Sequence, residues 1–280
     1  MTDTLELAVD DIRQHARATL DRAGVDEHLP VPIDVVASAV DLRRGDLYEF
    51  EDEVPPEMRK ILAKIQGNVL GVLSTDERRY YVDPTLPLER RRFTEAHEIG
   101  HDALPWHAGA YFAEDYTTLR SSTRDLLEAE ANQFAAEVLF AGDRFSEQAD
   151  AMQPSIEVPL SLNALYQTSA AATLRRYVAN SRHPLALIAT GLKQSRYGNL
   201  PVFSALSCES PSFSGSYGMV RSLVGEWIGS ARYPELHAFS TAHRGTVAAT
   251  ILTLDTARGN VRFVAEGFVN GRNGFVLLRE

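Results

Sequence analysis

The sequence has almost no cysteine. Cys208 is the single cysteine in 280 residues, so the chain can form no intrachain disulfide and no metal site rich in thiolates. Any metal ion must therefore be held by histidine and carboxylate side chains. A lone cysteine without a surrounding motif is typical of a small buried or half-buried side chain, and we assign Cys208 no chemical role.

Long hydrophobic runs are also missing. The longest apolar stretches, such as Val69–Leu73, are far too short to cross a bilayer. The N-terminus, MTDTLELAVDDIRQHAR, has no basic segment followed by an apolar run, which an export signal would require. The sequence therefore predicts a soluble, cytoplasmic protein without a membrane partner.

Basic residues are fewer than acidic ones. The chain has 28 Lys and Arg against 38 Asp and Glu, which gives a formal net charge of −10. This balance disfavours a protein that binds the phosphate backbone of a nucleic acid over its whole surface. A local basic patch is still compatible with it. We expect no extended nucleic-acid interface.

Apolar residues are plentiful, at 44% of the chain, and 280 residues exceed the usual size of one domain. Helical and strand patterns both occur, so the sequence predicts an α+β fold. The prolines between Met152 and Pro159 and the change in composition after Gly191 suggest three parts. They are residues 1–151, mainly helical with a small sheet, residues 152–190, helical, and residues 191–280, a small α+β unit.

The expected elements follow from hydrophobic periodicity and from breakers. Helices are predicted near residues 5–23, 33–40, 55–65, 83–104, 119–140, 160–166 and 169–180, and an amphipathic stretch at 220–228. Strands are predicted near residues 69–74, 80–82, 246–254, 261–268 and 275–278.

Two histidines carry the main motif. Within FTEAHEIGHDAL, His97 and His101 lie four residues apart on the helix predicted to end at Pro105. Their imidazoles therefore point the same way, one turn apart, and can share one metal ion. Glu98 can take a proton from a water molecule that the metal activates. This pattern, with the small Gly100 beside it, predicts a zinc site with Glu98 as the catalytic base.

A zinc site of this kind needs a third protein ligand, and two candidates compete. His107 follows the motif at the spacing of the metzincins, but Leu104 stands where those proteins have the glycine that turns the chain. The other candidate is Glu128 in LLEAEANQFAAEVLF, one helical turn before Asn132. Asn132 would then hold a histidine through its second ring nitrogen. Glu130, two positions after Glu128, is expected to point elsewhere.

Two further features of the site stay open. Manganese or iron could occupy two imidazoles and one carboxylate, although zinc is the expected ion. A side chain near the metal is expected to stabilise the developing oxyanion, and the nearest candidates in sequence are His107, Tyr111 and Tyr116. The sequence does not choose among them.

These residues resemble the ImmA/IrrE family of metallopeptidases. RRFTEAHEIGH looks like that family's zinc helix, and EAEANQFAAEVLF looks like its E-x-x-A-N-x-F-A-A helix. The resemblance implies a gluzincin-like site, with His97, His101 and Glu128 as zinc ligands and Glu98 as the base. It spans roughly Val31 to Phe140 and extends more weakly into residues 161–177. Phe140 and Ala141 stand where many members have Met-Pro, which concerns only the end of the second helix.

The resemblance also implies a function. Members of the family cut a helix-turn-helix repressor of the xenobiotic-response-element type, which relieves repression of stress-response or mobile-element genes. The implied activity is therefore that of a zinc-dependent, site-specific endopeptidase whose substrate is one repressor protein. Zincins commonly bind an extended peptide along an edge strand, and Val69–Leu73 or Tyr80–Val82 could offer that edge.

The resemblance assigns a role to each of the three parts. Residues 1–151 would be the zincin-like metallopeptidase domain, residues 152–190 a helix-turn-helix-like segment, and residues 191–280 a GAF-like sensor domain for an unknown small-molecule or protein signal. In the middle segment, Ser169 is predicted to cap a helix that carries basic residues. The acidic total charge nevertheless favours a packing role over direct DNA binding. The basic residues near this helix are Arg175, Arg176 and Arg182.

The rival hypothesis is a non-catalytic, metal-bearing regulatory module that binds its partner repressor and displaces it from DNA. Glu98 separates the two hypotheses, because a structural zinc site usually fills all four positions with protein ligands and needs no carboxylate beside an open position. A third hypothesis, a DNA-binding regulator, predicts a basic surface on the middle helices.

Overall fold

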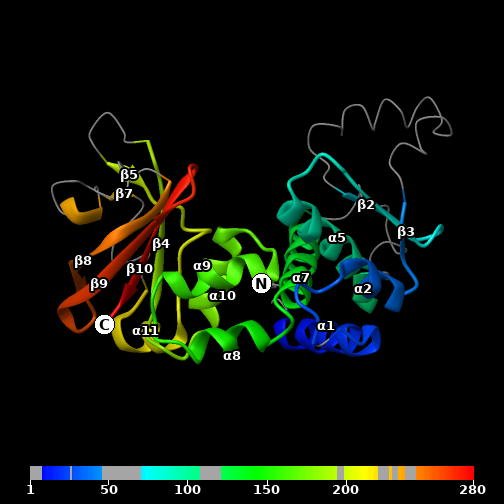
Figure 1. Cartoon of the computed structure of the whole chain (residues 1–280), viewed down its shortest axis with the longest axis horizontal. Coiled ribbons are helices and arrows are strands. Elements are labelled where there is room, and N and C mark those ends of the chain that lie inside the picture. The colour runs from blue at the N-terminus through cyan, green and yellow to red at the C-terminus, as the bar shows by residue number, and fades with distance from the viewer. Residues whose placement is uncertain are drawn as a thin grey trace. The chain divides into compact units, whose positions relative to one another are not determined.

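The computed structural model describes residues 8–25, 27–45, 71–107, 121–193, 199–219, 227–228, 233–236 and 244–280. The chain divides into two compact units, each with its own elements (Figure 1). Unit 1 comprises Met1–Arg144 and Leu165–Thr168, and unit 2 comprises Phe145–Ala164 and Ser169–Glu280. The predicted helix at 55–65, the tyrosines at 111 and 116 and most of the stretch at 220–228 lie outside the described residues.

Unit 1 begins with two helices that cover its core. Helix α1 (Val9–Ala23) ends at Gly24, whose φ of 64° is left-handed, as the sequence predicted. Helix α2 (Ile33–Ala39) follows Pro32, which supplies its N-cap. The core of unit 1 joins buried side chains from both helices to those of the later elements. They include Ile12, Ala16, Leu20, Val36, Tyr80, Val82, Ala96, Ile99, Phe134 and Val138.

The sheet of unit 1 has three short described strands, in the order β1-β3-β2. Strand β3 (Arg79–Val82) lies in the middle, parallel to β1 (Arg43–Arg44) and antiparallel to β2 (Gly71–Ser74). The hairpin between β2 and β3 turns at residues 75–78, where Arg78 has a φ of 54°. The two strands of this hairpin were predicted from the sequence.

Two longer helices complete unit 1 and lie side by side in Figure 1. Helix α5 (Leu88–Ala103) ends where Leu104 becomes extended, with a ψ of 107°, immediately before Pro105. This end follows from the chemistry of proline, which disfavours a helical residue before it. Helix α7 (Ser121–Leu139) is followed by a turn in which Ala141 has a φ of 50°.

Unit 2 begins with three helices, which are α8 (Arg144–Asp150), α9 (Glu157–Tyr166) and α10 (Ala170–Asn180). The Ser169 hydroxyl caps α10 by accepting a hydrogen bond from the backbone N–H of Ala172, as predicted. Helix α9 is tied to α10 through a hydrogen bond from the side-chain amide of Asn163 to the hydroxyl of Thr173. Helix α8 was not predicted.

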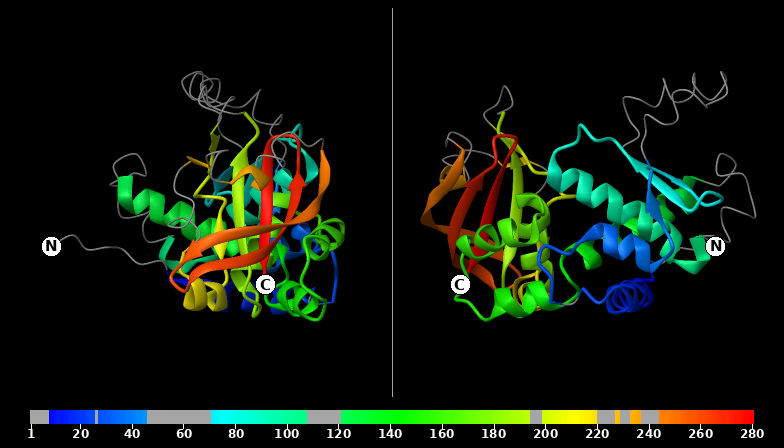
Figure 2. Two further views of the ribbon diagram at one scale, coloured as in Figure 1. Left: turned by 90° about the vertical axis from the view of Figure 1, so that its left-hand side faces the viewer. Right: turned by 45° about the vertical axis from the view of Figure 1, so that its right-hand side comes forward.

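A five-stranded antiparallel sheet forms the rest of unit 2, in the order β6-β4-β10-β9-β8, and Figure 2 shows its long strands side by side. The sheet buries aromatic and aliphatic side chains such as Phe213, Phe263 and Val276. Its strands are β4 (Ala186–Gly191), β6 (Cys208–Glu209), β8 (Gly245–Thr256), β9 (Gly259–Val269) and β10 (Asn273–Arg279). Helix α11 (Pro211–Tyr217) follows β6, and β5 (Leu200–Pro201) pairs with β7 (Trp227–Ile228).

The predicted α+β class is confirmed, because both units combine helices with a sheet. The predicted division into three parts stays a prediction. All but the last residue of strand β4 lie within residues 152–190, where the sequence analysis expected helices alone, and the strand pairs with β10 of the C-terminal hairpin. Within the described ranges, every helix is too short or too polar to span a bilayer.

Candidate metal centre

The candidate centre lies where α5 and α7 pack against each other. Gly100 of α5 makes this packing close, because a Cβ there would stand 3.1 Å from Cδ1 of Phe134 and 3.3 Å from the carbonyl oxygen of Ala131. Such distances are tighter than ordinary side-chain contacts. The two helices therefore approach closely at the turn of α5 that carries the histidine motif.

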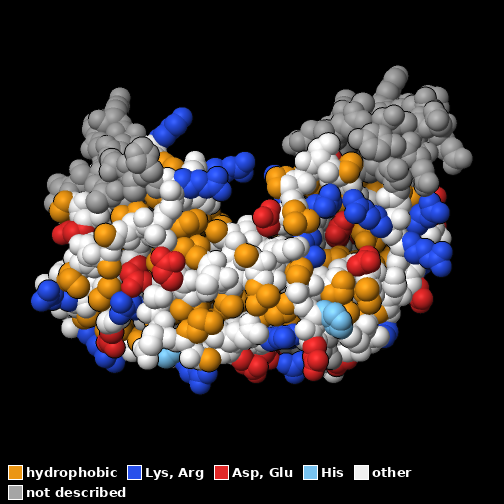
Figure 3. Space-filling model, viewed as in Figure 1, with side chains coloured by type: hydrophobic (Ala, Val, Ile, Leu, Met, Phe, Trp, Pro, Cys, Tyr) orange, Lys and Arg blue, Asp and Glu red, His pale blue; other side chains and the backbone are white. Residues whose placement is uncertain are grey.

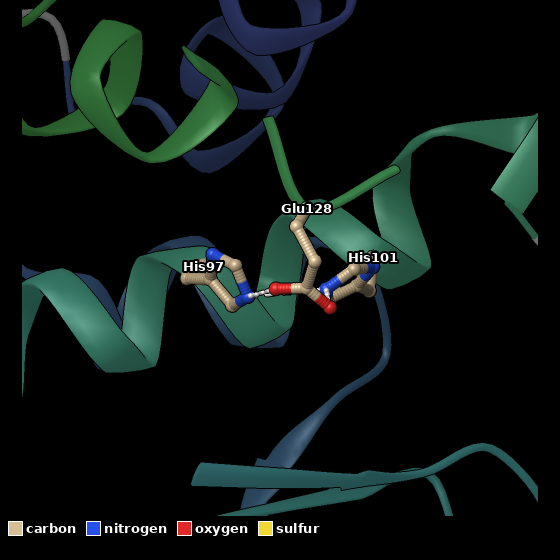
Figure 4. Close-up of side chains that lie close together, drawn as sticks. All are labelled: His97, His101 and Glu128. Atoms are coloured by element: carbon tan, nitrogen blue, oxygen red, sulfur yellow. Dashed lines mark hydrogen bonds and ion pairs between the residues drawn. The ribbon is translucent and has the colours of Figure 1, made fainter. Parts of the chain in front are cut away.

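Three side chains predicted as ligands come together at this contact. His97 and His101 project from one face of α5 toward Glu128 on α7 (Figure 4). The two Nε2 atoms lie 3.1 Å apart, and the carboxylate oxygens of Glu128 lie 3.2 Å from Nε2 of His97 and 3.7 Å from Nε2 of His101. All three ligand atoms fit within 4.8 Å of one another, which is the arrangement of donors that one metal ion requires.

The other ring nitrogen of each histidine already has a partner. Nδ1 of His97 lies 3.0 Å from the side-chain oxygen of Asn132, the residue that the sequence suggested for this position. Nδ1 of His101 lies 3.0 Å from Nδ1 of His107. With Nδ1 engaged on both rings, each histidine turns Nε2 toward Glu128, and the lone pairs of two imidazoles can face a metal ion.

Glu98 lies next to the histidines and is buried, with 7% of its surface exposed. Its carboxylate lies against β2, because a Cβ on Gly71 would stand 2.5 Å from Oε1 of Glu98 and 2.6 Å from Cγ2 of Thr94. A side chain at position 71 would therefore collide with the carboxylate. Because Gly71 has no side chain, the main chain of β2 lies directly beside Glu98, the predicted base.

The surroundings of these groups shift their pKa values away from the ordinary ones. Burial raises the pKa of Glu98 to about 7, with the charge of His97 opposing and that of Glu128 adding to the rise. Burial also lowers the pKa of His101, and the neighbouring His97 lowers it further. For His97, burial acts in the same direction, but the hydrogen bond that its ring donates to Glu128 and the charges of Glu98 and Glu128 outweigh burial and raise the pKa.

His107 and Glu130 form a second, fully buried cluster behind His101. Nε2 of His107 lies 2.9 Å from Oε2 of Glu130, and the same oxygen accepts a hydrogen bond of 2.7 Å from Nε1 of Trp106. His107 therefore contacts the ring of His101 and stands apart from the group of candidate ligands, which contains Glu128 in its place. Burial lowers the pKa of His107, and Glu130 opposes this effect.

The sequence analysis considered these two residues one at a time and did not pair them. Glu130 does point away from the candidate ligands, as expected from its position two residues after Glu128, but it points at His107. An available signal was the combination of Trp106, His107 and Glu130, three hydrogen-bonding side chains on segments predicted to flank one site. The other oxyanion candidates, at positions 111 and 116, lie outside the described residues.

The end of α5 is fastened to the hairpin of β2 and β3. The guanidinium of Arg78 pairs with both carboxylate oxygens of Asp102, at 2.5 and 3.0 Å, and also donates to the carbonyl oxygen of Val40. Asp102 directly follows His101 in the chain. This bidentate pair therefore fixes the position of one candidate ligand relative to the sheet.

Comparison with known proteins bears on both the site and the fold. The family profile described as IrrE N-terminal-like domain, of the M78 peptidases, matches residues 61–177. A Mycobacterium tuberculosis transcriptional regulator has a similar fold, with a TM-score of 0.56 and 14% sequence identity over 96% of this chain and 75% of that chain. No curated protein sequence matches the chain. The match to the IrrE N-terminal-like domain includes all of α5 and α7, and it supports the resemblance of this part of the chain to the ImmA/IrrE family.

Proposed function

We propose that this chain is a zinc-dependent endopeptidase that cleaves a helix-turn-helix transcriptional repressor at a specific site, and so relieves repression of stress-response or mobile-element genes. One observation carries the proposal. Two imidazoles and a carboxylate converge within 4.8 Å, and the buried Glu98 follows the first of these histidines in the chain. The match to the M78 peptidases supports the same reading.

His97, His101 and Glu128 would hold the ion. Two neutral imidazoles and one carboxylate are the ligands of many catalytic zinc sites, which keep a fourth position open. When bound there, zinc polarises a carbonyl group and lowers the pKa of a water molecule. Manganese is compatible with the same ligands and is the alternative ion.

Glu98 would handle the proton. A carboxyl group with a pKa near 7 can accept a proton from water and then deliver it to the amine that leaves the cleaved bond, because both transfers proceed best when the pKa of the group lies near the working pH. Burial beneath β2 keeps the carboxylate close to the ligands and away from bulk water. These properties favour a catalytic role for the metal ion over a purely structural one.

Strand β2 is the strand along which a substrate would extend. It is the last described strand in the order β1-β3-β2, and Gly71 places its main chain beside Glu98. An extended peptide that pairs with such a strand gains main-chain hydrogen bonds, and its side chains alternate between the two faces. We expect the scissile segment of the repressor to be extended rather than helical when it binds.

Direct DNA binding receives little support from the middle helices. Of the three arginines considered for that role, Arg176 is buried and Arg182 pairs with Asp150 at 3.1 Å, which leaves Arg175 exposed on α10. Acidic and basic side chains are interspersed among the described residues on the face drawn in Figure 3. A protein partner therefore fits this surface better than a nucleic acid does. Such a partner, a repressor, also implies action in the cytoplasm.

The test is cleavage of the helix-turn-helix repressor encoded nearest to this protein. The parent and the Glu98→Gln variant are incubated with that repressor and with zinc or manganese, and the products are read by intact mass. Glu89→Gln is the matched control, because Glu89 is an exposed glutamate at the start of the same helix. We expect cleavage by the parent and by Glu89→Gln, and a loss of at least 100-fold in rate for Glu98→Gln, on the order of the contribution of a general base.

The rival hypothesis, displacement without cleavage, predicts a different result. The parent and Glu98→Gln would then bind metal and form a complex with the repressor, the repressor would leave its DNA, and its mass would stay intact in both mixtures. Cleavage that persists in Glu98→Gln would contradict the role of Glu98 while leaving the metal centre in place.

A further inference from the structure

A series of hydrogen-bonded, buried side chains leads from His101 through His107 to Glu130 on α7. His101, His107 and Glu130 are 4%, 0% and 3% exposed, so bulk water does not serve as their hydrogen-bond partner. The ring nitrogens of His101 and His107 lie 3.0 Å apart, and His107 lies 2.9 Å from Glu130. Trp106 donates to the same oxygen of Glu130. A buried polar network of this kind stabilises a structure only when every member is satisfied.

The positions of the protons in this series of hydrogen bonds follow from its geometry. A metal ion on Nε2 of His101 leaves the proton of that ring on Nδ1, which lies 3.0 Å from Nδ1 of His107 and can donate to it. Nδ1 of His107 must then be an acceptor, so that this neutral ring carries its proton on Nε2 and donates it to Glu130. The carboxylate of Glu130 accepts hydrogen bonds from His107 and Trp106 and is the last member of the series. In this arrangement, each of these contacts has one donor and one acceptor.

We propose that His107, Glu130 and Trp106 form a relay that positions His101 and fixes its tautomer for metal binding. His107 is a positioning residue that acts through His101, and Glu130 holds His107 in turn. This inference rests on the proposed metal centre and goes beyond the three ligands and the base. It also assigns a role to His107 other than that of a ligand.

The two ligand histidines differ in how firmly they are held. His97 is half-buried, and its partner Asn132 is an exposed side chain whose amide can rotate. His101 is held by the buried ring of His107, which the buried carboxylate of Glu130 holds in turn, and these groups occupy space that cannot easily rearrange. His101 is therefore the preorganised ligand of the pair, and the relay should contribute more to metal affinity than Asn132 does.

The first test measures the tautomer directly in the zinc-loaded parent protein. Long-range ¹H–¹⁵N correlation spectra of the histidine rings distinguish a proton on Nδ1 from one on Nε2. We expect His107 to be neutral, with its proton on Nε2. A proton on Nδ1 of His107 would overturn the relay, because that ring could then accept nothing from His101. This test needs no substitution and so does not depend on the folding of a variant.

The second test compares zinc affinities, measured by competition with a chromogenic chelator. His107→Leu removes both ring nitrogens, and we expect its zinc affinity to fall roughly 10- to 100-fold, the usual effect of losing such a supporting group. His107→Asn places an amide oxygen near the position of Nδ1 and should recover part of the loss. His15→Leu is the matched control, because the ring of His15 contacts Trp106 at 5.4 Å without bonding to Glu130.

Each outcome of the second test decides something. The relay would be overturned if the zinc affinity of His107→Leu stayed within about threefold of that of the parent. An equal loss in His15→Leu would also overturn it, since packing around Trp106 rather than the hydrogen bonds would then set the affinity. Failure of the parent itself to bind zinc would instead contradict the metal centre. Circular dichroism of each variant in the absence of zinc confirms that it is folded.

Discussion

At the scale of single residues, Glu98 is a carboxyl group whose buried surroundings disfavour its charged form. Burial raises the pKa of this carboxyl group to about 7, so the folded protein without metal holds a proton between pH 4.5 and 7 that the unfolded chain has released. Folding therefore becomes less favourable as the pH rises through this window. The free energy lost by pH 8 is about 3 kcal/mol, at 1.36 kcal/mol per pKa unit.

Glu98→Gln should remove this loss, because a carboxamide has no proton to release. We expect the metal-free variant to be more stable than the metal-free parent at pH 8, by about 1–3 kcal/mol, and equally stable at pH 4. Urea unfolding in the presence of a chelator measures the difference. A variant that is less stable than the parent at pH 8 would show that the ionised carboxylate is well solvated or paired. The substitution that abolishes cleavage would thus stabilise the fold.

The part of the site that lies on one helix could be predicted from the sequence. His97, Glu98 and His101 follow from spacing alone, because positions one turn apart share a face. Glu128 and Asn132 needed the upstream motif as context. The relay of His107 and Glu130 could not be predicted, because its members are 23 residues apart and meet only after the chain turns at Leu104. Gly71 was missed because spacing does not show what a strand will approach.

At the scale of elements, the contact between α5 and α7 sets the geometry of the centre, since it joins two ligands on one helix to the third on the other. Gly100→Ala should improve the intrinsic helix propensity of α5 by about 1 kcal/mol. It would also press a methyl group against Phe134 and the carbonyl of Ala131, at 3.1–3.3 Å. We expect these effects on stability to cancel approximately, whereas the displacement of α7 should lower zinc affinity several-fold.

The measurements are thermal unfolding without metal and the same chelator competition. The matched control is Arg90→Gly near the other end of the same helix, an exposed position where the change weakens helix propensity without touching the contact. If Gly100→Ala bound zinc as tightly as the parent, then α7 would have room to adjust and the close approach would have no bearing on the centre.

The elements that could be predicted are those with a clear hydrophobic periodicity or with a clear helix- or strand-breaking residue at an end. Helices α5 and α7 and the strands β8, β9 and β10 appear within a few residues of their predicted ends. Strand β4 was missed because its six residues are all buried, so they form an apolar run without the alternation that marks a half-exposed strand. A short run of this kind does not distinguish a strand from a buried helix.

At the scale of the whole molecule, the two compact units should respond differently to metal. All the candidate ligands lie in unit 1, whereas the core around Phe213 and Phe263 lies in unit 2. A ligand that binds only the folded state stabilises the unit that it binds. We therefore expect zinc to slow amide hydrogen exchange in α5 and α7 and to leave β9 and β10 unchanged.

Hydrogen exchange followed by mass spectrometry, with zinc and with chelator, makes this comparison on peptides from each unit. The Glu128→Gln variant is the control, because it should lose most of the zinc-dependent protection in unit 1. Equal protection of both units by zinc would mean that they open as a single cooperative body. The predicted sensor role of the C-terminal part would then have a physical route to the metal centre.

Gly71 has a consequence for any attempt to transplant this site. The carboxylate of Glu98 occupies the space that a side chain at position 71 would fill, and that position lies 27 residues upstream on a strand rather than on the helix of the motif. Grafting the histidine motif onto the helix of another scaffold would therefore not be sufficient. The smallest portable version of the centre has three pieces: the motif helix, the helix that carries Glu128, and a strand that offers bare main chain to the base.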